Sequence, residues 1–136
     1  MNTDSEGRLS AFFEAYEKAI QPDSNADLCG FYHQSFLFAG PKGAQPVKLE
    51  DFARFVPKMS ADARARGLAS TTLKSHEIVP LDNLYSLARV IWDITFRQGG
   101  KPDHHIDTRA TYILMRVESS FRIVAQIDHQ DLSRIA

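Results

Sequence analysis

The stretch FRIVAQIDHQDL, residues 121–132, decides how the rest of the chain is arranged. It begins with the alternation of apolar and polar residues that is typical of a strand with one buried face. It ends in the polar run Asp128-His129-Gln130-Asp131. Because neighbouring strand residues point to opposite faces, the register of this strand determines whether Asp128 or His129 faces the interior. The alternatives for this polar end are a pocket floor and a solvated strand end or dimer contact.

The sequence before this stretch alternates in the same way over three long segments. Together with residues 121–132 they predict a four-stranded antiparallel meander, with turns at Asp82-Asn83 and near Ser119-Ser120. Two shorter strands are predicted earlier in the chain. The predicted strands before the last one are 36–39, 45–48, 68–81, 85–97 and 105–117.

The N-terminal half predicts helices. Apolar residues recur at three- and four-residue steps in residues 3–20, a shorter helix is expected at 26–30, and a third at about 50–66. Helices separate from an antiparallel sheet indicate the α+β class. We therefore expect N-terminal helices packed in the concave face of a strongly curved, mainly antiparallel sheet, a cone-shaped α+β barrel.

Length and composition favour one domain spanning residues 1–136, with a core of its own. The formal net charge of -1 gives no electrostatic basis for binding nucleic acid or an anionic membrane. No apolar run approaches the ~20 residues that cross a bilayer. The single Cys29 fits a reducing compartment, so we predict a cytoplasmic protein. No glycine loop of the kind that holds phosphates is present, and we predict no cofactor.

The order of elements and three local motifs resemble the nuclear transport factor two-like superfamily. The motifs are AYEKAI at 15–20, AGPKG at 39–43 and RATYILMRVESSFRIV at 109–124. The superfamily includes ketosteroid isomerases, scytalone dehydratases and SnoaL-type polyketide cyclases, and its closing hairpin often reads R-x-T…D-G-x-W-R-I-V. Here Glu118-Ser119 stands where Asp-Gly is common. The resemblance implies a curved sheet wrapped over the helices around an apolar cavity, in a subfamily of unknown function.

The resemblance also implies roles for individual residues. Tyr16 matches the helix tyrosine that donates to the oxyanion in ketosteroid isomerases. The position of the isomerase's general-base aspartate is Gly40 here, so steroid isomerase chemistry is not supported, and the dehydratase's His and Asp set has no match. SnoaL-type cyclases use an acidic residue on a late strand, which points to Asp128 as a proton shuttle.

Two registers of the last hairpin remain open. A two-residue Ser119-Ser120 loop places Tyr112 opposite Ile127 and Ala110 opposite His129, with His129 near the mouth. A three-residue loop with a bulge places Tyr112 opposite Gln126 and Ala110 opposite Asp128. The second register gives a polar floor of Gln126 and Asp128, and we favour it.

The first hypothesis is therefore a small-molecule-binding protein with an apolar aromatic pocket, whose ligand is an apolar or aromatic molecule. The predicted lining is Tyr16, Tyr32, Phe38, Trp92, Tyr112, Gln126, Asp128 and His129. A homodimer is expected through the outer sheet face. The alternatives are a cofactor-free isomerase, dehydratase or cyclase that uses Asp128 as proton shuttle and Tyr16 as oxyanion donor, and a non-catalytic dimerisation or assembly domain. In the last case the same aromatic residues fill the cone.

A metal site is the least favoured reading. His104, His105 and Asp107, together with His129, have ligand chemistry that suits zinc but lack any specific ligand spacing. We predict no metal.

Overall fold

The computed structural model describes residues 3–24 and 27–130. Its helices are α1 (Thr3–Ala19), the short 3₁₀ helix η1 (Leu28–Phe31) and α2 (Leu49–Ala65). Its strands are β1 (Tyr32–Gly40), β2 (Gly43–Lys48), β3 (Leu68–Pro80), β4 (Tyr85–Phe96), β5 (His104–Val117) and β6 (Ser120–Asp128). The predicted α+β class is confirmed.

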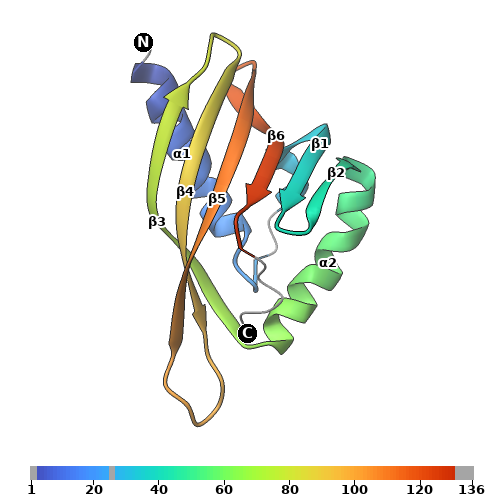
Figure 1. The fold of residues 1–136 in the computed structure, drawn as a ribbon, viewed down its shortest axis with the longest axis vertical. Helices are drawn as coiled ribbons and strands as arrows, with labels where there is room; N and C mark the ends of the chain where they lie inside the picture. Colours follow the sequence, from blue (N-terminus) through green and yellow to red (C-terminus); the bar gives the residue numbers. More distant parts are fainter. Residues whose placement is uncertain (1–2, 25–26, 131–136) are drawn as a thin grey trace.

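The strands form one six-stranded sheet in the order β2-β1-β6-β5-β4-β3. The predicted meander β3-β4-β5-β6 is antiparallel throughout, and β1 joins it by pairing parallel with β6. The sheet is not closed, because β2 and β3 are its two edges. Figure 1 shows α1 crossing one face of the long strands and α2 lying beside β1 and β2.

The core lies between α1 and the inner face of the sheet. Leu9 and Phe13 on α1 and Leu114 and Ile123 on the strands are fully buried. Polar contacts fasten the end of α1 to β3: the side chain of Gln21 accepts from the Thr71 amide at 3.0 Å and donates to its carbonyl at 2.6 Å. α1 is thereby held across the sheet, which fixes the position of its inward aromatic residues.

The last strand contains a β-bulge that changes which residues face inward. Near the turn Leu114 pairs with Ile123, but Ile113 pairs with Ala125, so Val124 is an extra residue on β6. Before the bulge Phe121 and Ile123 are buried in the core. After the bulge the even-numbered residues Gln126 and Asp128 face inward, because one inserted residue reverses which side chains point to each face.

α2 packs more loosely than α1. None of its residues is buried, and Phe55 and Met59 are 52% and 36% exposed. Phe52 provides its aromatic contact with the core, with ring centroids 4.8 Å from Tyr32 and 5.3 Å from Phe36. The helix therefore leaves apolar side chains unburied beside β1.

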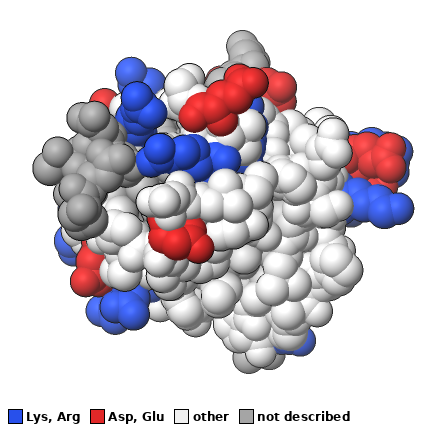
Figure 2. Space-filling view, turned by 90° about the horizontal axis from the view of Figure 1, so that it is seen from above, with Lys and Arg blue, Asp and Glu red and all other residues white. Residues whose placement is uncertain are grey.

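The surface carries no strong electrostatic pattern on the face seen in Figure 2, where acidic and basic side chains are interspersed over an otherwise uncharged surface. Within the part of the chain that the structure describes, no helix is long and apolar enough to cross a membrane.

Candidate functional site

The register of β5 and β6 places two polar residues on the inner face of the sheet. Tyr112 pairs with Gln126 and Ala110 pairs with Asp128, which is the second of the two predicted registers. The turn itself differs from both predictions, since the two-residue loop is Glu118-Ser119 and the bulge lies inside the strand. Gln126 and Asp128 therefore share a face with the buried side chain of Tyr112.

A chain of hydrogen bonds connects the core to Asp128. The Tyr16 and Tyr32 hydroxyls lie 2.7 Å apart, and the Tyr32 hydroxyl donates to Gln126 Oε1 at 2.5 Å. Gln126 Nε2 donates to Asp128 Oδ1 at 3.1 Å. Because Tyr32 uses its one proton on Gln126, Tyr16 is the donor of the first bond. In this series of hydrogen bonds, each donor therefore points toward Asp128.

The aromatic interior around this chain is filled. Tyr16, Tyr32, Trp92 and Tyr112 are between 2% and 5% exposed. Trp92 Nε1 donates to the Tyr112 hydroxyl at 3.2 Å. Among the described residues, no buried side-chain nitrogen or oxygen lacks a hydrogen-bond partner. The deep aromatic residues that were predicted to line a pocket are brought together, but they pack against one another.

Burial sets the protonation of these groups. Desolvation raises the pKa of the Tyr16, Tyr32 and Tyr112 hydroxyls well above the ordinary value, so they stay protonated donors at neutral pH. Desolvation also raises the pKa of the Asp128 carboxyl, against the opposing effects of the Gln126 hydrogen bond and of His129. A carboxyl group with a raised pKa exchanges a proton more readily near neutral pH than an ordinary aspartate.

Among the residues that the structure describes, one oxygen of Asp128 has no hydrogen-bond donor. Its Oδ1 accepts from Gln126, while no hydrogen bond to Oδ2 is found among residues 3–24 and 27–130. The side chain is half-buried, at the end of β6. Asp128 is therefore the polar group of the inner face at which a bound molecule could make a new hydrogen bond.

Two predicted pocket residues lie away from the buried cluster. Phe38 shares the inner face, because it pairs with Gln126, but its side chain is 37% exposed at the rim. His129 is exposed, and its Nε2 lies 2.8 Å from the hydroxyl of Thr111, a residue of the outer face. The inclusion of His129 in the pocket lining is corrected by this geometry, since Asp128 takes the inward position.

His105, near the start of β5, makes contacts at the surface. His105 Nδ1 lies 3.0 Å from the Thr95 hydroxyl and 3.3 Å from Asp93 Oδ1. Asp107 pairs with Lys74. Among the described residues, no three side chains of His, Cys, Asp or Glu are grouped as a metal ion requires.

Sequence reasoning missed the contribution of α2 to this site. Phe52 packs against the ring of Tyr32, whose hydroxyl donates to Gln126, so α2 helps to hold that hydroxyl in place. The apolar spacing of Phe52, Val56 and Met59 indicated an amphipathic helix, but periodicity alone does not say which strand residue the helix meets.

Comparison with protein families gives one match, to the family described as NTF2-like protein (DUF6841), over residues 4–131. Comparison with curated proteins gives no match.

Several solved structures share the fold at low sequence identity. An NTF2-like protein with a cystatin-like fold from Novosphingobium aromaticivorans is 12% identical with a TM-score of 0.72, over 91% of this chain and 80% of that one. Aln2 from a Streptomyces species is 12% identical with a TM-score of 0.73, over 99% of this chain and 96% of its own. A protein provisionally named an aromatic ring hydroxylase, also from N. aromaticivorans, is 12% identical with a TM-score of 0.73, over 95% of this chain and 90% of that one. At such identities the likeness shows the fold alone.

Proposed function

The chain belongs to the NTF2-like protein family DUF6841, and we propose that it binds a small apolar molecule with a carbonyl or hydroxyl group at Asp128. We call the surroundings of this residue the Asp128 site, formed by Phe38, Gln126 and Asp128. The observation that carries the proposal is the inward position of Asp128, half-buried beside Gln126 and with Oδ2 unbonded among the described residues. A hydroxyl donates to Oδ2 directly, and a carbonyl accepts from it when the carboxyl is protonated.

An exposed aromatic side chain in the site supports an apolar ligand. Phe38 lies on the same face as Gln126 and is 37% exposed. Covering such a side chain with a flat apolar molecule removes its surface from water, at about 25 cal/mol for each Å². A few polar groups within an apolar lining are typical of small-molecule sites.

The binding proposal is tested with a neutral aromatic alcohol. We expect 2-naphthol, followed by its own fluorescence, to bind the purified protein, and Asp128→Leu to weaken binding roughly fivefold or more through loss of a charge-assisted hydrogen bond. His129→Leu is the matched control, since it changes the neighbouring residue on the opposite face. Equal affinity in both variants, or no binding to the wild type, would contradict the proposal. Native mass spectrometry shows in addition whether a small molecule co-purifies.

A second candidate function is proton transfer at such a ligand, and the raised pKa of Asp128 favours it. In the proposed step the Asp128 carboxylate takes a proton from the carbon next to a carbonyl, and the electron pair moves onto the carbonyl oxygen. The proton returns to a different carbon, which isomerises the ligand. To stabilise the oxyanion, Tyr16 would have to give up its bond to Tyr32, and Tyr32 its bond to Gln126. The second N–H of Gln126 Nε2 is therefore the nearer donor.

This candidate is tested with 2-tetralone in D₂O, whose acidic protons next to the carbonyl exchange measurably by ¹H NMR. We expect the protein to accelerate exchange, and Asp128→Asn to remove roughly 10²-fold or more of that acceleration. If Asp128→Asn exchanges the 2-tetralone protons as fast as the wild type does, Asp128 is not the base and this candidate function is contradicted.

The third candidate is a non-catalytic dimerisation domain, which the filled interior around Phe12, Trp92 and Tyr112 favours. For all three candidate functions, we propose that a homodimer forms through the outer sheet face. Leu87 on β4 pairs with Ile113 on β5, and both are half-buried on that face, as are Ile91 and Met115. Light scattering coupled to size exclusion is expected to give twice the chain mass, and Ile113→Lys to give the monomer. A monomeric wild type would contradict the dimer.

A further inference from the structure

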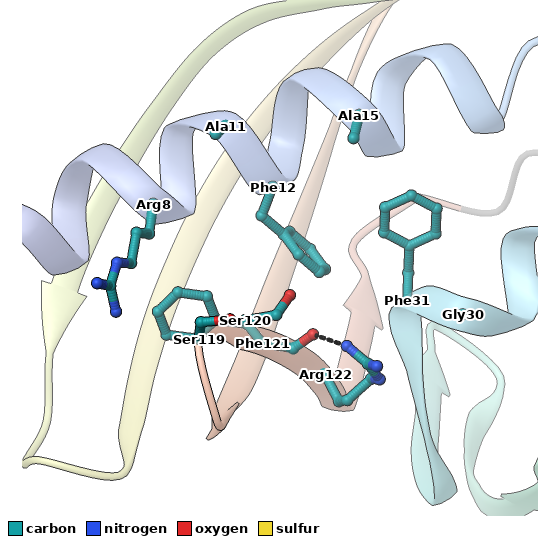
Figure 3. Close-up of a pocket in the computed structure, with 10 residues that line it drawn as sticks. All are labelled: Arg8, Ala11, Phe12, Ala15, Gly30, Phe31, Ser119, Ser120, Phe121 and Arg122. Atoms are coloured by element: carbon teal, nitrogen blue, oxygen red, sulfur yellow. Dashed lines mark hydrogen bonds between the residues drawn. The ribbon is translucent and has the colours of Figure 1, made fainter.

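A second concave site lies between α1 and the beginning of β6, at the opposite end of that strand from Asp128. It has a volume of about 330 Å³, within the usual range for small-molecule clefts. α1, η1 and the turn between β5 and β6 enclose it, as Figure 3 shows. The Asp128 site is at the end of β6, whereas this one is at its beginning. We call it the α1 groove, defined by Arg8, Phe12, Phe31, Ser119, Phe121 and Arg122.

The wall of the α1 groove is aromatic. The rings of Phe12 and Phe31 meet edge to face with centroids 5.4 Å apart, and Phe12 stacks on Tyr16 at 6.2 Å. Phe12 is 7% exposed, so it separates the groove from the tyrosine cluster. A flat ring placed against Phe12 and Phe31 would contact aromatic side chains that are held in place by their packing on Tyr16 and on each other.

The rim of the groove is basic. Figure 3 shows Arg122 below Phe31 and Arg8 on the far side of the Ser119–Phe121 segment. Arg122 Nη1 donates to the Phe121 carbonyl at 2.9 Å, which holds the guanidinium beside the groove. Among residues 7–24 and 27–130, no other acceptor is found for its N–H groups. Neither arginine forms a salt bridge with a carboxylate of residues 7–24 or 27–130.

These observations point to one class of ligand. We propose that the α1 groove binds a flat aromatic carboxylate, with the ring against Phe12 and Phe31 and the carboxylate on Arg122. A guanidinium presents paired N–H groups that match a carboxylate, and the ring supplies the apolar contact. Arg8 is exposed and adds electrostatic attraction from the other side, so its contribution is smaller than that of Arg122.

The test is a titration with 2-naphthoate followed by ¹⁵N–¹H correlation NMR. A ligand of this size is expected to bind with a Kd on the order of 1 mM. The amides of Phe31, Ser119, Ser120 and Arg122 are expected to shift. Arg122→Gln should weaken binding roughly tenfold and Arg8→Gln about threefold, because each removes a positive charge from the rim. Arg54→Gln is the matched control, since Arg54 lies on α2 and does not line the groove.

The neutral analogue 2-naphthol separates this inference from the proposal for Asp128. We expect 2-naphthol to leave the groove amides unshifted at concentrations where 2-naphthoate moves them, and Asp128→Leu to leave 2-naphthoate binding unchanged. Unaltered 2-naphthoate affinity in both arginine variants would overturn the inference, as would shifts confined to Gln126 and Asp128. If 2-naphthol fails to bind at Asp128 while 2-naphthoate still shifts the groove amides, the proposal for Asp128 is wrong and the inference for the α1 groove stands. Circular dichroism of each variant establishes that it is folded.

Discussion

Ala110 on β5 lies directly opposite Asp128 on β6, and this pairing turns Asp128 toward the interior. Ala110 is buried, so the aspartate across from it borders the core and not the outer face. The pairing depends on the bulge at Val124, because without the extra residue His129 or Ile127 would take the inward place. The bulge therefore decides which chemistry the inner face carries.

Replacing Tyr32 by Phe interrupts the hydrogen-bond chain to Asp128. The substitution removes the donor to Gln126 and the acceptor for Tyr16, and leaves the Tyr16 hydroxyl in a buried place without its partner. We expect a loss of roughly 1–3 kcal/mol in the free energy of unfolding, measured with urea. Tyr85→Phe is the control, because Tyr85 is half-buried on the outer face. If Tyr32→Phe is as stable as the control, the hydrogen bonds from Tyr16 to Asp128 contribute nothing to the free energy of unfolding.

The raised pKa of Asp128 makes the stability of the fold depend on pH. In the folded protein burial favours the protonated carboxyl, so its stabilising effect is complete below the ordinary pKa of 3.8 and is lost as the pH rises through the raised folded pKa. Asp128→Asn has no such carboxyl. We therefore expect the stability of Asp128→Asn relative to wild type to increase over this pH window and then level off.

Urea unfolding at a series of pH values measures the difference in the free energy of unfolding between the two proteins. The contributions of the other carboxylates to the pH dependence are common to both and cancel in this difference. A difference that stays constant with pH, or that falls as the pH rises, would contradict the desolvated position of Asp128.

The turn at Glu118 offers a stabilising substitution. Glu118 has a φ of 58°, in the left-handed region where a side chain is unfavourable. Glu118→Gly is expected to raise the free energy of unfolding by roughly 0.5–1 kcal/mol, because glycine adopts this conformation without strain. Ser119→Gly is the control in the same loop; Ser119 has no positive φ, so the change should destabilise. Thermal unfolding compares the two, and a lower melting temperature for Glu118→Gly would refute the account of the turn.

Gly67 connects α2 to β3 at a position that excludes a side chain. Its φ is 94°, and an added Cβ would lie 2.8 Å from the Arg97 carbonyl oxygen. Gly67→Ala is expected to cost about 2 kcal/mol or more of stability through strain and backbone displacement. Gly99→Ala is the control, since a Cβ there meets nothing within 4 Å. Equal urea midpoints for the two variants would show that the connection is not strained.

The sequence predicted the fold well because its signals are local. The segments 68–81, 85–97 and 105–117 begin and end within one residue of β3, β4 and β5. Alternation of apolar and polar residues is enough to place such strands, and the helix period is enough to place α1. The parallel pairing of β1 with β6 was not predicted, since it joins residues far apart in the chain.

The site could be predicted only in part. The residues Phe121, Ile123, Ala125 and Ile127 alternate without interruption, so nothing local signals the bulge at Val124. Sequence reasoning could state two registers, and the pairing of β6 with both β5 and β1 selects between them. The α1 groove was missed for a similar reason, because Arg8 and Arg122 come together only in the folded chain.

The most direct test of the central claim is an amide NMR titration of the wild-type protein with 2-naphthol. If the Asp128 site binds a small apolar molecule with a hydroxyl group, the amides of Phe38, Gln126 and Asp128 shift saturably, and Asp128→Leu raises the 2-naphthol concentration needed for half-saturation roughly fivefold or more. Shifts that are absent at these three residues, or that persist unchanged in Asp128→Leu, would contradict it.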